Sequence, residues 1–203
     1  MPNRLKIDFN FPDPTALRAS QASSNVPLRV SWLHGAPASS LRANVAVTLS
    51  PSSTSFPAFK DYTFDDPSRT ISTEEVSVFD GLLDASGEAT VNPMIRSTQQ
   101  APGQLKADFT VRVFEPGGGF SIDRFSIPYL PYTSFAGVQA PKGEGWGNIL
   151  TVNKQHTLNL ACVNDLGKGI PGRTLSVNFY KTSYEWWWQR NGNINDYYNA
   201  EYA

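Results

Sequence analysis

Alternation of polar and apolar residues dominates this chain, and it begins within the first ten positions. Residues 6–11 alternate over their whole length, and the pattern returns in four further segments: 26–32, 41–49, 104–114 and 120–128. A period of two residues is typical of a half-buried β-strand. No segment shows a convincing helical period, so the sequence predicts an all-β fold.

Turn-forming residues separate these runs. Asp84 to Glu88 is predicted to be a hairpin turn, because Asp bonds its own backbone and Gly87 supplies a positive φ. Gly117 to Gly119 is predicted to turn one strand back into the next. It lacks the Lys and Ser/Thr of a phosphate-binding loop. Residues 16–25 are expected to be a connection of small residues.

Short strands at near-regular spacing predict one antiparallel β-sandwich from about Arg4 to Pro131, which needs about seven strands. Its expected core consists of Phe9, Leu28, Val30, Trp32, Val45, Val47, Phe109, Val111 and Val113. The region 51–67 is less regular. Its aromatic residues are expected to clip a surface loop to the edge of the sandwich: Phe56, Phe59, Tyr62 and Phe64.

A second domain is predicted to begin near Phe135, which divides the chain into residues 1–134 and 135–203. Strands are expected at 158–162 and 174–180, separated by a turn at 164–172, and within this turn residues 165–168 repeat the chemistry of 84–88. So few strands cannot bury their own apolar faces. The second domain is therefore expected to be an incomplete sandwich, truncated at residue 203.

Composition narrows the functional classes. Hydrophobic residues make up 40% of the 203 positions, which is enough for a core, and charged residues only 17%. The net charge of -1 and the lack of a basic run argue against nucleic-acid binding. The single cysteine, Cys162, excludes an internal disulfide, and its apolar neighbours indicate a buried strand position. No apolar run is long enough to span a membrane.

No set of residues has the pattern of a catalytic site. His34 and His156 are the only histidines, and neither stands at metal-ligand spacing from another His or Cys. The acidic pairs at 65–66 and 74–75 point to opposite faces of an extended chain, so they are interpreted as solvated loop charges. We therefore expect no enzymatic activity, no cofactor and no metal.

Three consecutive tryptophans form the candidate contact site of the chain. Alternation places Trp186 and Trp188 on one face of a strand and Trp187 on the other. One interpretation is packing within the complete second domain. A second is an interdomain or partner contact, because Trp is enriched in such anchors. A third is a flat platform for sugar rings.

Five segments, in order, resemble bacterial alpha-2-macroglobulins. The stretch Trp32 to Ala38 resembles the Trp-Leu-(Tyr/Phe/His)-Gly-Ala-Pro-Ala segment of that family, and Phe56 to Tyr62 resembles Phe-Pro-Gly-Phe-x-x-Tyr. The other three are the entry strand at 2–7, the passage at 132–138 and the aromatic stretch at 177–188. The resemblance covers nearly the whole chain and implies central macroglobulin-like domains of the fibronectin III or immunoglobulin type.

The resemblance implies a scaffold segment of an endopeptidase inhibitor that traps proteases in the bacterial periplasm or at the cell surface. Its partners would be neighbouring domains of the same parent chain and, for the whole protein, proteases. Cys162 does not fit the family's thioester motif, Cys-x-Glu-Gln, because Val163, Asn164 and Asp165 follow it. No bait segment is recognisable. The alternative is an adhesive or carbohydrate-binding module of a surface protein.

Overall fold

The computed structural model describes residues 4–21, 25–93, 95, 100–144 and 149–179. Its strands are β1 Leu5–Phe9, β2 Leu17–Arg18, β3 Val26–Trp32, β4 Arg42–Pro51, β5 Val76–Leu82, β6 Glu88–Val91, β7 Leu105–Phe114, β8 Phe120–Leu130, β9 Ser134–Gln139 and β10 Asn159–Asn164. Two short 3-10 helices, η1 Ala19–Gln21 and η2 Pro57–Phe59, complete the described elements. The described chain is therefore all-β, as the alternation predicted.

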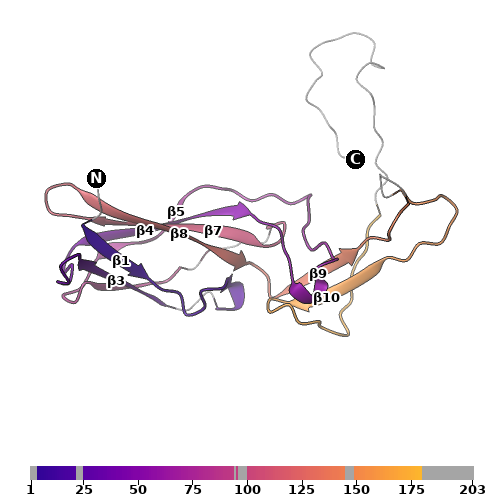
Figure 1. The fold of residues 1–203 in the computed structure, drawn as a ribbon, viewed down its shortest axis with the longest axis horizontal. Coiled ribbons are helices and arrows are strands. Elements are labelled where there is room, and N and C mark those ends of the chain that lie inside the picture. Colours follow the sequence, from indigo (N-terminus) through magenta and orange to yellow (C-terminus); the bar gives the residue numbers. More distant parts are fainter. Residues whose placement is uncertain (1–3, 22–24, 94, 96–99, 145–148, 180–203) are drawn as a thin grey trace, which may run out of the picture. The chain divides into compact units, whose positions relative to one another are not determined.

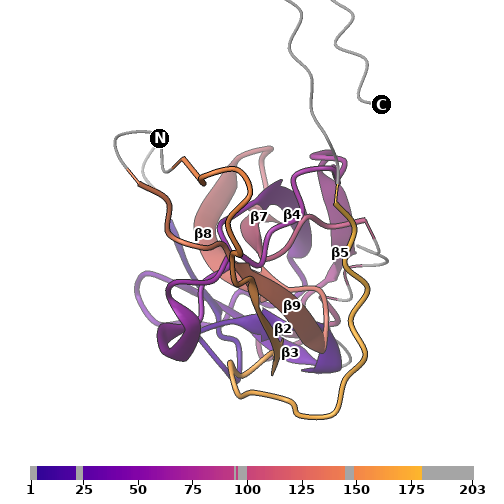
Figure 2. The same ribbon diagram turned by 90° about the vertical axis from the view of Figure 1, so that its right-hand side faces the viewer.

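Eight of these strands form a β-sandwich. One layer is a five-stranded sheet in the order β2-β8-β7-β4-β5, and the other is a three-stranded sheet in the order β1-β3-β6 (Figures 1 and 2). All pairs are antiparallel except β2 with β8, which run parallel over two residues. The predicted antiparallel sandwich is confirmed. The short strand β2 lies in a segment that was expected to be only a connection.

The sandwich core lies between these layers. Eight of the nine expected core residues are buried, and Val45 and Val47 of β4 stand opposite Val111 and Phe109 of β7. Burying side chains of this size contributes about 1.5–3 kcal/mol each. Trp32 is only half-buried, because it stands at the end of β3, where its ring lies 6.2 Å from that of His34.

One of the two predicted turns forms a hairpin, and the other does not. The Gly117 to Gly119 turn joins β7 to β8 as a hairpin, with Phe114 paired to Phe120. At the other turn the Asp84 carboxylate accepts N–H bonds from Ser86 (2.8 Å) and Glu88 (2.9 Å). However, this turn passes from β5 in one sheet to β6 in the other, so the predicted hairpin is wrong. Local turn chemistry does not determine which strand the exiting segment will pair with.

A third sheet contains only β9 and β10, paired antiparallel from Ser134 with Asn164 to Gln139 with Asn159. We call this pair the ribbon. The strand expected at 158–162 is thus confirmed with shifted ends. The strand expected at 174–180 is not present in its described part, residues 174–179, which pair with no other segment there. Alternation alone does not make a strand, because a strand also needs a hydrogen-bonded neighbour.

The described chain divides into two compact units, residues 1–172 and 173–203. The first unit contains the sandwich and the ribbon. Of the second unit only residues 173–179 are described. No helix among the described residues is long and apolar enough to cross a membrane.

Candidate functional site

A buried cluster joins the ribbon to the long loop between β4 and β5, residues 52–75. This junction cluster consists of Ala16, Phe56, Phe64, Leu130, Phe135 and Val163. The Phe56 ring centroid lies 5.0 Å from that of Phe64 and 5.4 Å from that of Phe135, in edge-to-face arrangements. The loop aromatics were expected to pack on the edge of the sandwich. Instead the rings pack on Phe135 of β9 and Val163 of β10, together with Leu130 at the end of β8.

Backbone hydrogen bonds reinforce the junction cluster. The N–H of Thr63 donates to the carbonyl of Val138 (2.8 Å), and the N–H of Val138 donates to the carbonyl of Thr63 (2.9 Å). The loop therefore forms an isolated β-bridge with β9, along the edge of β9 that does not pair with β10. Two glycines make the approach possible. A Cβ on Gly137 would overlap the Phe64 ring, and one on Gly167, where φ is +73°, would lie 2.9 Å from Phe56.

Asp65 anchors the same loop. Its carboxylate accepts the N–H of Thr54 (3.0 Å) and the hydroxyl of Thr54, whose oxygen in turn accepts the N–H of Gln104 (2.6 Å). Gly103 packs so closely that a Cβ there would overlap Asp65. The interpretation of Asp65 as a solvated charge is wrong, because the carboxylate is half-buried and holds the loop to the start of β7.

The two acidic pairs nevertheless form no carboxylate dyad. Asp66 has partners of its own: it accepts the N–H and hydroxyl of Ser68 and pairs with Arg69 at 3.0 Å. The Ser68 hydroxyl is the main reason why the pKa of Asp66 lies below its usual value. Glu75, just before β5, pairs with Arg112 of β7 at 3.2 Å. These contacts give Asp66 and Glu75 a structural role, whereas Glu74 is exposed, as expected of a solvated loop charge.

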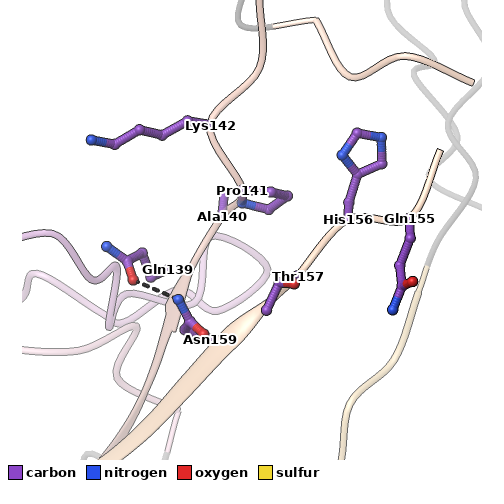
Figure 3. Close-up of a pocket in the computed structure, with 8 residues that line it drawn as sticks. All are labelled: Gln139, Ala140, Pro141, Lys142, Gln155, His156, Thr157 and Asn159. Carbon is purple, nitrogen blue, oxygen red and sulfur yellow. Dashed lines mark hydrogen bonds between the residues drawn. The ribbon is translucent and has the colours of Figure 1, made fainter.

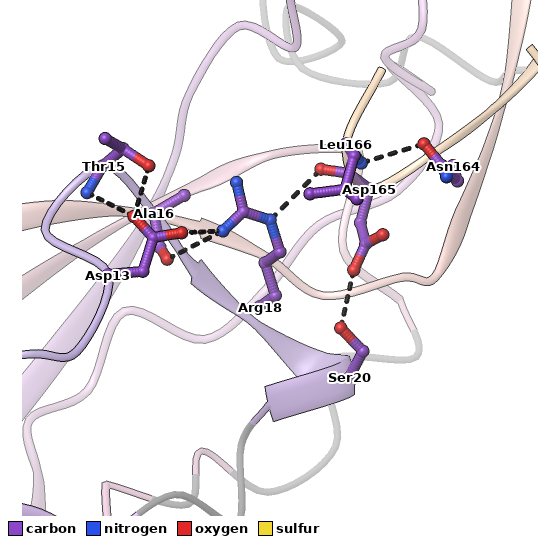
Figure 4. A network of polar contacts seen from close by, with 8 residues as sticks. All are labelled: Asp13, Thr15, Ala16, Arg18, Ser20, Asn164, Asp165 and Leu166. Carbon is purple, nitrogen blue, oxygen red and sulfur yellow. Dashed lines mark hydrogen bonds and ion pairs between the residues drawn. The ribbon is translucent and has the colours of Figure 1, made fainter. Parts of the chain in front are cut away.

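A polar bridge lies beside the junction cluster, between β2, η1 and the end of β10 (Figure 4). The Arg18 guanidinium pairs with the Asp13 carboxylate and donates from Nε to the carbonyl of Asp165 (3.3 Å). The hydroxyl of Ser20 donates to the Asp165 carboxylate (2.7 Å). The Arg18 side chain is only 12% exposed, and its guanidinium contacts both Asp13 and Asp165.

The pKa of Asp13 in this bridge lies well below its ordinary value. Hydrogen bonds from the hydroxyl and N–H of Thr15 lower its pKa to about 2, and Arg18 adds to that effect. The pairing therefore favours the charged carboxylate. Because both members are already satisfied within the fold, the bridge has the features of a structural contact.

The turn after β10 places the Asp165 carboxylate beside Ser20 in this bridge. The side-chain oxygen of Asn164 accepts the N–H of Leu166 (3.0 Å) and of Lys168 (2.9 Å), as Asp84 does in its own turn. The predicted repeat of turn chemistry is thus confirmed, with one difference. Asn164, not Asp165, is the capping residue, which leaves the Asp165 carboxylate available for Ser20.

The other candidate residues are not members of the junction cluster. His34 is exposed in its turn, and Cys162 is half-buried in β10, so its expected full burial is wrong. His156 borders an open hollow of about 420 Å³, together with Gln139, Lys142 and Asn159 (Figure 3). Its Nε2 lies 2.9 Å from the carbonyl oxygen of Thr151.

Two further expectations concern metal and partner binding. Within the described ranges, no group of three or more His, Cys, Asp or Glu residues is placed to hold a metal ion. Trp186, Trp187 and Trp188 lie outside the described residues, so their role as a contact site stays a prediction.

Sequence reasoning missed the junction cluster because its members come from a loop, a turn and strand ends. The one signal that could have found it is the density of aromatic residues between 56 and 64, where the chain has no strand period. Phe135 stands on an alternating strand, but alternation does not tell which face is buried against what. The two close-packed glycines carry no periodic signal at all.

Comparisons with known proteins agree with the motifs. The model of the bacterial alpha-2-macroglobulin MG5 domain matches residues 3–130, and that of bacterial macroglobulin domain 6 matches residues 137–203. An alpha-2-macroglobulin homolog from Yersinia pestis is 27% identical over 185 residues, which are 90% of this chain and 9% of that protein.

A solved structure gives a weaker likeness. The native conformation of E. coli alpha-2-macroglobulin matches with a TM-score of 0.45 and 18% identity, over 83% of this chain and 11% of that one. The chain thus spans a small fraction of the length of the relatives it matches. Because the first family model alone covers more than half of the chain, the chain belongs to the bacterial alpha-2-macroglobulin family.

Proposed function

We propose that the chain is a scaffold segment of a bacterial alpha-2-macroglobulin-like endopeptidase inhibitor, which traps proteases in the periplasm or at the cell surface. The match to two consecutive macroglobulin domain models supports this role. So does the small share of its relative's length that the chain spans. In this proposal the chain contributes packing and has no catalytic activity of its own.

The single observation that carries the proposal is the junction cluster. Its buried rings and the reciprocal Thr63–Val138 bonds tie the sandwich to the ribbon through several contacts at once. A trap that closes on a protease needs segments stiff enough to pass a movement from one domain to the next. A buried apolar cluster with paired backbone groups provides that stiffness, because opening it would expose both.

The proposal divides the chain into a first macroglobulin-like domain at 1–134 and a part of a second at 135–203. The ribbon is then the start of the second domain, and the junction cluster is the interface between the two. Neighbouring domains of the same parent chain would be the direct partners, and proteases the targets of the whole protein. Trp186, Trp187 and Trp188 are proposed as a further interdomain or partner contact.

Protease assays with two substrates test the trap. Trypsin and elastase are mixed at equimolar ratio with this chain, or with the longer protein that carries it. Hydrolysis of a large protein and of a small chromogenic peptide is then followed. The longer protein is expected to block only the large substrate, because a caged protease stays open to small molecules. The chain alone is expected to change neither rate. Inhibition by the chain alone, or none by the longer protein, would overturn the proposal.

A further inference from the structure

β5 stands at the margin of the five-stranded sheet and pairs only with β4 (Figures 1 and 2). Just beyond its end, the N–H of Leu83 donates to the carbonyl of Leu41 (2.8 Å). Bonded and non-bonded residue pairs alternate along an antiparallel ladder, so the N–H and C=O groups of Leu82 and Asp80 point away from β4. No other described residue bonds to these groups. β5 therefore has a free edge.

This free edge is little protected against further pairing. Outer strands commonly carry Lys or Pro, or are covered by a loop. Residues 74–84 contain no Lys, Arg or Pro, and Leu82 is 67% exposed. A register shift leaves Val78 without a counterpart on β4, but the pairing is regular from Phe79 to Leu82. That part of β5 is therefore able to accept a further strand.

The charge of β5 and its flanks determines which kind of strand fits. Residues 74–84 carry no basic side chain and four acidic ones: Glu74, Glu75, Asp80 and Asp84. The cations that pair with two of these lie on inner strands, Arg42 on β4 and Arg112 on β7. Like charges on paired strands are destabilising, so the acidic run disfavours a second copy of β5 as the partner. A basic strand has the complementary charge.

Asp80 and Leu82 give the free edge a side-chain pattern. Residues two apart in a strand share a face. On this face the Asp80 carboxylate accepts two bonds from the Arg42 guanidinium, both at 2.8 Å. The Asp80 side chain is nevertheless 44% exposed, so a further cation is able to reach it. The edge thus presents a carboxylate followed by an exposed apolar side chain.

We propose that the free edge of β5 binds an extended basic segment of a partner polypeptide, which adds a strand to the five-stranded sheet. The backbone groups of Asp80 and Leu82 bond to the main chain of that segment. A Lys or Arg stands opposite Asp80, and an apolar side chain stands opposite Leu82. Main-chain bonds supply the affinity, and the charge selects the partner.

This inference goes beyond the proposed scaffold role and does not depend on protease trapping. The edge recognises backbone and charge, whereas the trap is tested by the size of the substrate that a protease can still cleave. Each proposal can therefore fail without the other.

The test is an NMR titration of the 203-residue chain with a short blocked peptide in which lysine alternates with valine. Saturable shifts are expected at the amides of Asp80 and Leu82, together with slower hydrogen exchange there. The Val111 amide of β7 should not respond. A peptide with glutamate in place of lysine should bind about tenfold more weakly, because two cross-strand charge pairs are reversed. A peptide with proline in place of its central valine should also lose binding.

Variants of the chain separate the backbone from the charge. The Leu82 N–H points away from β4, so Leu82→Pro removes an edge donor and no bond to β4, and should weaken binding of the lysine peptide about tenfold. Leu82→Thr keeps the N–H and is the matched control, with binding within a few-fold of the original. Asp80→Asn should narrow the preference for the lysine peptide over the glutamate peptide. Circular dichroism checks that each variant is folded.

Any of four results contradicts the proposal. One is a lysine peptide that shifts no amide of β5, and another is equal binding of the lysine and glutamate peptides. A third is binding that neither Leu82→Pro nor Asp80→Asn weakens. The fourth is protection of the Asp80 and Leu82 amides without peptide. If that protection rises with protein concentration, the occupant is a second copy, and if it persists on dilution, the occupant is the chain itself.

Discussion

The sandwich core and the junction cluster are two apolar assemblies built in different ways. The sandwich core takes alternate residues from long paired strands, so that Val111, Phe109 and their neighbours are held by the backbone ladder itself. The junction cluster takes the Phe56 and Phe64 rings from a loop, and Phe135 and Val163 from one face of the two-stranded ribbon. The comparison shows that regular pairing builds the first, whereas space left by Gly137 and Gly167 makes the second possible.

The β1–β3 pair and the ribbon are both two antiparallel strands, but they differ in the side chains on one face. The outward positions of the first pair are Lys6, Asp8, Arg29 and Ser31, which face solvent or form ion pairs. The corresponding positions of the ribbon are Phe135, Gly137, Ala161 and Val163. The first pair thus has a polar outer face, whereas the ribbon has an apolar face that packs in the junction cluster.

The largest effect is expected in the sandwich core. Phe109→Ala removes a ring that is 1% exposed and stacks on Phe125 at 5.3 Å, so it should lower the free energy of unfolding by about 3–5 kcal/mol. Urea unfolding followed by circular dichroism measures this loss. Val76→Ala on the edge strand β5, 58% exposed, should change stability by less than about 0.5 kcal/mol. Equal losses from both variants would contradict a core centred on Phe109.

A smaller and more local effect is expected at the junction cluster. Gly137→Val forces a side chain into the Phe64 ring and should cost about 1–3 kcal/mol. Phe64→Ala should relieve the overlap, so the double variant should be more stable than the sum of the two single changes requires. Gly119→Ala meets nothing within 4 Å and is the matched control. Strict additivity in urea unfolding would mean that Gly137 and Phe64 do not touch.

The turn after β10 should respond next. Asn164→Ala removes an acceptor of two N–H bonds and should cost about 1 kcal/mol. Asn164→Asp should be tolerated, because Asp84 holds the same pair of bonds in its own turn. Thermal unfolding of both variants measures the difference. If Asp is as damaging as Ala, the two turns are not equivalent.

The smallest effect concerns pH. The folded pKa of Asp13, about 2, lies below the ordinary 3.8, so its contribution to stability is complete above pH 3.8 and is lost as the pH falls toward 2. Its partly exposed setting limits this contribution to below about 1 kcal/mol. Carboxyl titration by NMR measures the pKa directly. Thr15→Val should raise the pKa of Asp13, while that of Asp80, lowered by Arg42, should stay where it is.

The alternation of polar and apolar residues was enough to predict the sandwich strands and their core-facing residues. Alternation at Leu28 and Val30, and at Phe109 to Val113, correctly located the strands and the residues that face the core. It could not place the Phe56 and Phe64 rings, because a loop without a period gives no direction. It also could not tell that the ribbon would bury Phe135 and leave Val138 exposed, since both alternate equally well. Which face is covered depends on tertiary partners.

Turns show the same limit. The residue types at 84–88 and 164–168 predicted that a side chain in each turn would bond to nearby backbone N–H groups, and both turns contain such bonds. Whether β5 and β6 would pair was decided by the layers of the sandwich, which lie beyond the turn. The Arg18 bridge was out of reach for a related reason, because residues 18 and 165 are brought together only by the whole fold.

Docking of the ribbon on the long loop is tested most directly by hydrogen exchange at the amides of Thr63 and Val138. These groups bond only to each other's carbonyls across the junction, at 2.8 and 2.9 Å. Both are expected to be protected to the same degree. Gly137→Val is expected to lower both protection factors together and to leave the Val111 amide in β7 unchanged. Exchange of Thr63 and Val138 at the rate of an unstructured peptide would contradict the docking.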